Sequence, residues 1–218
     1  MLGDGAFPSA LQMTQVQLPP GPLAVDACGA DACAYFPVDA LITIGPEGSA
    51  QAAVALVGRH GCVIWPQVGQ AAMQAQVMVP GLAYRVNWAV VRDDPTRYTK
   101  WLWHAAAATQ GLVKQMAQWA FCVQHHAPTQ RLASWLLYCM AQSSVGQLQL
   151  SLHALPTSMC PCLGGAQVSA CSAQQLPGVE VREGILSAVA PQDLLARACT
   201  CHQKLAVRSE TVQPRASD

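Results

Sequence analysis

Cysteine and histidine are the residues of this chain whose types and spacing could do chemistry. There are ten cysteines and six histidines among 218 residues, and Cys160, Cys162 and Cys171 fall in a stretch of eighteen positions, 159–176, without a charged residue. With His153 they could offer four soft ligands to zinc. Structural zinc sites favour cysteines two to four residues apart, however, and a Cys-Pro-Cys pair is a poor chelate. A thiol-based metal or redox sensor at these three cysteines is one alternative function.

A second group contains Cys199, Cys201 and His202. On one continuous helix, residues two positions apart lie about 200° apart around the axis, so the two thiols would not share a face. Four other cysteines lack the tight spacing of an iron–sulfur cluster; they are Cys28, Cys33, Cys62 and Cys122. The sequence therefore predicts no metal and no cofactor.

No pattern typical of catalysis is present. The sequence has no Gly-x-Ser-x-Gly, no phosphate-binding loop and only 12 acidic residues. His125 and His126 lie between two helical patterns, where histidines commonly cap a helix end. We expect a protein that is not an enzyme.

The composition favours a packed globular protein. The chain is 52% hydrophobic and 11% charged, with a formal net charge of zero, so nothing global indicates a nucleic-acid or membrane partner. The first residues do not resemble an export signal, and no apolar run is long enough to span a bilayer. We expect a cytoplasmic protein whose cysteines are reduced.

Residues 15–86 show the patterns of β-structure. Met73, Ala75, Val77 and Val79 alternate with glutamines, which indicates a half-buried strand, and alternation resumes beyond Pro80-Gly81. Short strand candidates punctuated by glycine and proline precede them at 15–25, 32–44 and 50–58. Such a series is typical of a sandwich or roll.

A helical stripe follows, with apolar residues three and four positions apart. It consists of Trp101, Ala105, Ala108, Leu112, Met116, Trp119 and Val123. A helix of this length with a narrow apolar seam suits packing against a second copy. The predicted dimer interface is Leu112, Met116, Trp119 and Val123; the alternative is that the helix simply lies on the roll.

The rest of the chain shows the patterns of shorter helices and strands. Pro128 fits the first position of a new helix over 128–142. A strand is expected at 147–152, a β-hairpin around Glu183-Gly184, and a closing helix from Pro191.

The order of these parts resembles the Crp/Fnr family of bacterial transcription regulators. YFPVDALIT at 35–43 and AVALVGRHGCV at 53–63 resemble strands of its β-roll. QMAQWAFCVQHHAPTQRLASWLL at 115–137 is similar to its passage from long helix to linking helix. LLARACTCHQKL at 194–205 resembles the closing helix of a subgroup with Cys-x-Cys there.

The resemblance implies an α+β fold of three parts. These are a jelly-roll-like, cyclic-nucleotide-binding-like β-roll over 1–99, a dimerisation helix over 100–127, and a winged helix-turn-helix over 128–218. Counting along the family pattern puts His153 at the start of the DNA-reading helix pair. It puts Gly164 and Gly165 where the family has arginines, so the stretch 159–176 lies at a helix-turn-helix that lacks its usual cations. The candidate DNA-binding residues are His153, Gln167, Ser169, Gln174, Gln175 and Arg182.

The sequence thus predicts a homodimeric regulator that binds promoter DNA, with no membrane partner and an unknown effector. Family members that bind cyclic nucleotides use a glutamate and an arginine, whereas Arg59 is the only charged residue between Gly58 and Val79. A buried phosphate needs a cation and the ribose needs an acceptor, so we expect no response to cyclic nucleotides. Because residues 147–181 contain no Lys or Arg, the alternative is a regulator-derived dimer with weak or lost DNA binding.

Overall fold

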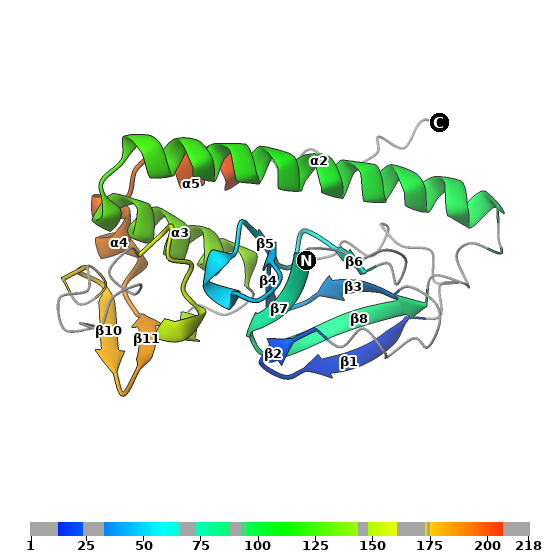
Figure 1. The fold of residues 1–218 in the computed structure, drawn as a ribbon, viewed down its shortest axis with the longest axis horizontal. Helices are drawn as coiled ribbons and strands as arrows, with labels where there is room; N and C mark the ends of the chain where they lie inside the picture. The colour runs from blue at the N-terminus through cyan, green and yellow to red at the C-terminus, as the bar shows by residue number, and fades with distance from the viewer. Residues whose placement is uncertain are drawn as a thin grey trace.

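Two antiparallel β-sheets, a long helix lying along them and a smaller C-terminal unit make up the computed structural model (Figure 1). The structure describes residues 13–23, 33–65, 73–87, 93, 95–143, 148–160, 173 and 175–206. Within these ranges, no helix combines the length and hydropathy needed to cross a membrane.

Eight strands between residues 14 and 87 form the N-terminal β-unit. Their bounds are β1 Thr14–Leu18, β2 Gly21–Pro22, β3 Cys33–Pro37, β4 Leu41–Pro46, β5 Ala55–Val57, β6 Val63–Trp65, β7 Met73–Val79 and β8 Gly81–Asn87. They pair in the orders β1-β8-β3-β6 and β2-β7-β4-β5. Tyr35 and Ala83 of the first sheet share a core with Ile42 and Val77 of the second, so the two sheets pack face to face.

The alternating pattern around Pro80 is confirmed as two strands, but they do not pair with each other. β7 pairs with β4, and β8 pairs with β1 and β3. Pro80 cannot donate a ladder hydrogen bond, and the Leu82 N–H is held by the Asp39 carboxylate instead. A Cβ at Gly81 would meet the Ala40 nitrogen at 2.7 Å, so only glycine fits there. The chain therefore crosses from one sheet to the other at this point.

Helix α2, Pro95–His125, is 31 residues long and covers both the β-unit and the C-terminal unit (Figure 1). Trp101 packs among Phe36 and Val86 of the β-unit. Further along, Trp119 lies edge-on to Tyr138 of α3, with ring centroids 5.8 Å apart. One face of α2 is thus buried along most of its length.

The buried side-chain amide of Gln115 fixes which face of α2 is turned toward the rest of the chain. Gln115 is 3% exposed, and its Oε1 accepts a hydrogen bond of 2.7 Å from the Leu56 N–H of β5. Its Nε2 donates to the Leu56 carbonyl at 2.9 Å and to the Tyr138 hydroxyl at 2.7 Å. These bonds satisfy strand groups that would otherwise be buried without partners, and they join β5, α2 and α3.

Helix α3, Pro128–Gln142, begins at its proline as expected and runs back beneath α2. The C-terminal unit, residues 148–206, contains strands β9 Leu148–Ser151, β10 Val179–Arg182 and β11 Ile185–Ala188, paired in the order β10-β11-β9. Glu183 and Gly184 have φ values of 51° and 78°, as the two central residues of a type I′ hairpin require. The predicted hairpin is confirmed.

The closing helix differs from the expectation because it is split. Helix α4 spans Pro191–Arg197 and helix α5 spans Cys201–Ala206. At the break, the Cys199 carbonyl accepts from the Ser134 hydroxyl at 2.9 Å and lies 2.8 Å from His202 Nδ1. Side chains therefore take the place of the backbone N–H that would bond the Cys199 carbonyl in a continuous helix.

The amide of Gln115 gives the first prediction. Gln115→Ala leaves the Leu56 N–H and carbonyl buried without partners, so the free energy of unfolding should fall by about 2–4 kcal/mol. Urea unfolding with an unchanged m-value measures this loss. Gln110→Ala, at an exposed position of the same helix, should change stability by less than about 0.5 kcal/mol. Equal effects of the two substitutions would show that the amide has no special role.

Candidate functional site

Three of the six residues expected to contact DNA belong to the described part of the chain, and all three are exposed. His153 lies in the short 3-10 helix η3, Leu152–Ala154, and Gln175 lies in a turn before β10. Arg182 ends β10 beside the hairpin turn. Gln167, Ser169 and Gln174 lie outside the described residues, as does most of the expected helix pair. Over 152–160, after β9, the chain forms η3 and turns rather than an α-helix.

The hairpin carries little net positive charge. The Arg182 side chain is 83% exposed, and its Nη2 lies 3.1 Å from Glu180 Oε2. Glu183 follows in the turn. The described part of the C-terminal unit contains three Lys or Arg residues and three Asp or Glu residues, so its formal charges balance. Any phosphate contact here therefore depends on Arg182 more than on a basic field.

The four residues expected at the dimer interface do not share a free surface. Trp119 is 5% exposed, and Val123 packs against the same core as Trp119 and α3. Leu112 packs on the core of the β-unit, whereas Met116 is 41% exposed. The stripe read from the sequence is thus mostly the face that α2 turns toward its own chain.

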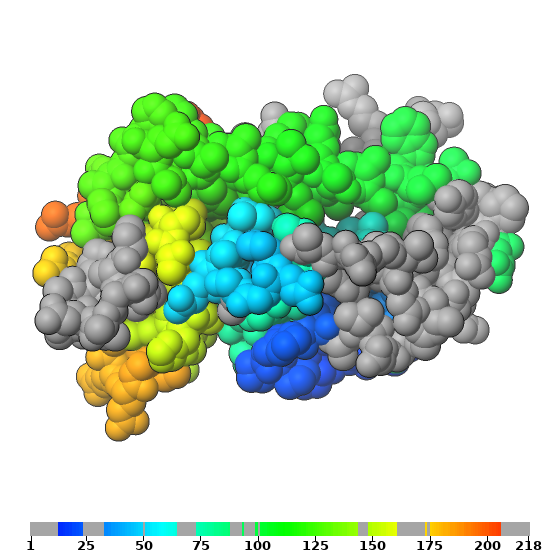
Figure 2. All heavy atoms as spheres, in the orientation of Figure 1, coloured from blue at the N-terminus to red at the C-terminus, as the bar shows by residue number. Residues whose placement is uncertain are grey.

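A different stripe of α2, the outer stripe, is exposed. Its residues alternate in spacings of four and three; they are Leu102, Ala106, Thr109, Val113, Met116 and Ala120. Val113 is 59% exposed, and Trp103 beside the stripe is 75% exposed. This spacing matches the core positions of a coiled coil and covers roughly 27 Å at 1.5 Å per residue. In Figure 2, α2 forms the upper border of the molecule.

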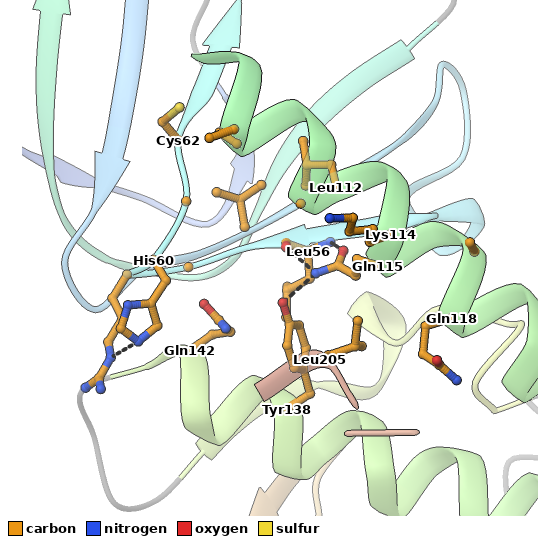
Figure 3. Close-up of a pocket in the computed structure, with 18 of the residues that line it drawn as sticks. Leu56, His60, Cys62, Leu112, Lys114, Gln115, Gln118, Tyr138, Gln142 and Leu205 are labelled. Atoms are coloured by element: carbon orange, nitrogen blue, oxygen red, sulfur yellow. Dashed lines mark hydrogen bonds between the residues drawn. The ribbon is translucent and has the colours of Figure 1, made fainter. Parts of the chain in front are cut away.

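On another side of α2 lies a cavity of about 660 Å³, here the α2 pocket (Figure 3). Its walls are residues 56–62, a face of α2 from His104 to Phe121, Tyr138 and Gln142 of α3, and Lys204 and Leu205 of α5. Gly58 lets the β-unit approach α3, because a Cβ there would meet Gln142 Cβ at 2.6 Å. The Arg59 N–H then donates to the Gln142 carbonyl at 3.0 Å. The pocket therefore touches both the β-unit and the C-terminal unit.

The charged groups of the α2 pocket are cationic. Arg59, Lys114 and Lys204 line it, and no Asp or Glu occurs among its lining residues within the described ranges. Arg59 Nε donates to His60 Nε2 at 3.0 Å. Partial desolvation, with the nearby Arg59 charge, lowers the pKa of His60. The pocket combines apolar walls with groups suited to an anion.

A cluster of thiols that the sequence did not predict joins α2 to α5. The donor atoms of Cys122, His126, Cys199 and Cys201 all lie within 4.8 Å of one another. The prediction that Cys199 and Cys201 point to different faces was wrong, because Cys199 lies in the break before α5 and follows no helical geometry. His125 behaves as expected, with Nδ1 2.9 Å from the Phe121 carbonyl at the end of α2.

The other cysteines take no part in this cluster. Cys33 is disulfide-bonded, which differs from the expectation of reduced thiols throughout. The remaining described cysteines are not disulfide-bonded. Cys160 is buried in the core of the C-terminal unit, while Cys162 and Cys171 lie outside the described residues. The alternative of a thiol-based sensor at Cys160, Cys162 and Cys171 is thus not tested by the described residues.

No family model and no curated protein matches the sequence. Its neighbours among solved structures include a CRP/FNR family regulator and proteins described as cyclic-nucleotide-binding. A CRP/FNR family transcriptional regulator from Thermus thermophilus shares 14% identity over 91% of this chain and 100% of its own, with a TM-score of 0.48. FixK2 from Bradyrhizobium japonicum shares 11% over 87% and 98%, with a TM-score of 0.47. At such distances these neighbours carry no argument about what this chain binds.

The α2 pocket can be tested by filling it. Gly111 lines the cavity and a Cβ there would meet nothing within 4 Å, so Gly111→Leu is expected to extend a side chain into it. The variant should bind anilinonaphthalene sulfonate, an apolar anion, at least tenfold more weakly than the unchanged chain, as measured by fluorescence titration. Gly111→Ala should retain binding and gain about 0.5–1 kcal/mol of stability, because glycine is unfavourable inside a helix. Equal dye affinity in both variants would place the binding elsewhere.

Proposed function

We propose that this chain is a homodimeric, DNA-binding transcription regulator of the Crp/Fnr type, in which α2 forms the dimer interface. The observation that carries the proposal is the outer stripe. Six exposed residues in coiled-coil spacing, none of them charged, lie on a helix whose opposite faces already pack within the chain. A soluble helix rarely leaves a continuous apolar seam in water, and an identical seam is its natural complement.

Two-fold pairing of α2 would orient the C-terminal units for one DNA duplex. Each unit follows the end of α2 through α3 and presents the exposed hairpin β10–β11 on the molecular surface (Figure 1). In this proposal Arg182 contacts a phosphate, and the exposed side chains of His153 and Gln175 lie near the DNA. Gln167, Ser169 and Gln174 complete the base-reading set that the sequence predicts.

The α2 pocket is the effector site in this proposal. A ligand there would touch residues 56–62 of the β-unit, α2 and the C-terminal helix α5 at once, so its binding could change how the units sit on α2. Because Arg59, Lys114 and Lys204 surround it without a carboxylate, the ligand would be an anion with an apolar body. A cyclic nucleotide would lack the acidic partner for its ribose hydroxyl, so the regulator does not respond to one.

A charged side chain introduced into the outer stripe tests the proposed dimer interface. Val113→Glu places two carboxylates opposite each other across the seam, where unpaired buried charges cost several kcal/mol. The dimer dissociation constant should therefore rise by roughly 100-fold or more. Sedimentation equilibrium measures it. Ala107→Glu adds the same charge on an exposed position roughly 120° around the helix from Val113 and should leave the dimer intact. If the unchanged chain sediments as a monomer, the proposed function fails.

DNA binding is tested by gel retardation of upstream genomic DNA at several salt concentrations. Retardation should weaken as salt rises, and Arg182→Ala should reduce the steepness of that dependence by about 1.8 in log–log slope, about 0.9 for the one phosphate contact that each protomer loses. Glu180→Gln, which frees Arg182 from its partner, should instead strengthen binding. Absence of retardation even at low salt, together with an intact dimer, would favour the alternative of a regulator-derived dimer that has lost DNA binding.

A further inference from the structure

The thiol cluster at the end of α2 has the composition of a closed metal site. Cys122 and His126 are four residues apart, so they project from one side of the helix end. Cys199 precedes α5, and Cys201 is its first residue. Three thiols and one imidazole form the Cys₃His set found in structural zinc sites.

The distances fit one tetrahedral ion. Cys122 Sγ lies 3.5 Å from Cys199 Sγ, and Cys201 Sγ lies 3.6 Å from His126 Nδ1. Zinc bonds of about 2.3 Å to sulfur and 2.0–2.1 Å to nitrogen, at tetrahedral angles, require sulfur–sulfur distances of about 3.8 Å and sulfur–nitrogen distances of about 3.6 Å. Because all donor atoms are within 4.8 Å of one another, an ion at their centre needs only small side-chain shifts.

Surrounding side chains hold the donors in place. The Ser134 hydroxyl is 3.0 Å from Cys199 Sγ and also bonds the Cys199 carbonyl. Gln118 Nε2 donates to Cys201 Sγ at 3.2 Å. An N–H donated to sulfur, as from Gln118, orients a ligand and stabilises its thiolate in metal sites, and the Ser134 contacts fix the position of Cys199. The three sulfurs are nearly inaccessible to water, since Cys122 and Cys201 are 0% exposed and Cys199 is 7% exposed.

We propose that Cys122, His126, Cys199 and Cys201 bind one zinc ion that fastens α5 to the end of α2. A full set of four protein ligands leaves no open position for substrate, so the role is structural. The ion displaces the thiol protons and leaves a compact charged group where three buried thiols would otherwise crowd together. It also ties the last described helix to the helix that carries the outer stripe. The site does not depend on DNA binding.

Metal content of the full-length chain, purified under reducing conditions and measured by mass spectrometry of the elements, tests the proposal. The unchanged chain should hold about one zinc per chain. Cys199→Ser and Cys201→Ser should each lose most of it. His126→Cys should retain it, because a fourth thiolate replaces the imidazole in the same geometry. Cys139→Ala, which removes a buried thiol of α3 outside both the cluster and the α2 pocket, should retain zinc as well.

Cobalt titration keeps the test decisive if the variants fold poorly. Co²⁺ added to the reduced, metal-stripped chain should give the visible bands of a tetrahedral ion and strong thiolate-to-metal charge transfer, and zinc should abolish both. The proposal is overturned if the reduced chain takes up neither metal. It is also overturned if Cys122 and Cys199 are found joined by a disulfide in protein prepared under the same reducing conditions.

Discussion

The rotational setting of α2 is the constraint on which the rest of the structure depends, and the Gln115 amide fixes it. With its Oε1 and Nε2 bonded to the Leu56 backbone and to Tyr138, the helix cannot turn about its axis without leaving strand groups buried and unpaired. The large side chains Trp101 and Trp119 fill the core on either side of this point. The directional hydrogen bonds of Gln115 therefore specify the rotation of α2 about its axis, and apolar packing supplies most of the stabilisation of the fold.

With this rotation fixed, the other parts of the α2 surface lie in three different environments. The outer stripe faces away from the chain and carries the exposed Val113. Another face closes the α2 pocket against the β-unit and α5. The C-terminal end brings Cys122 and His126 to the thiol cluster. A dimer contact, an effector site and a metal site on one rigid helix would be mechanically linked, because a rotation or tilt of the helix alters all three.

Sequence periodicity located α2 but could not show which of its two apolar stripes the chain itself covers. Both stripes have spacings of three and four, alanine fills two positions in each, and Met116 belongs to both. Periodicity reports that a face is apolar and cannot report whether the chain itself or another molecule covers it. Trp119 illustrates the difference, since its spacing put it at the predicted dimer interface while the structure buries it beside Tyr138.

The sequence by itself determined the local elements: the alternating strands β7 and β8, the helix starting at Pro128, and the hairpin that turns at Glu183-Gly184. Such features follow from side-chain periodicity and backbone preferences over a few residues. Only the tertiary structure decided that β7 and β8 belong to different sheets and that Cys122 lies 3.5 Å from Cys199. Cys122 and Cys199 are 77 positions apart along the chain. The break before α5 brings them together, and it depends on the Ser134 hydroxyl of α3. Contacts of this kind depend on the packing of whole helices, which no local pattern contains.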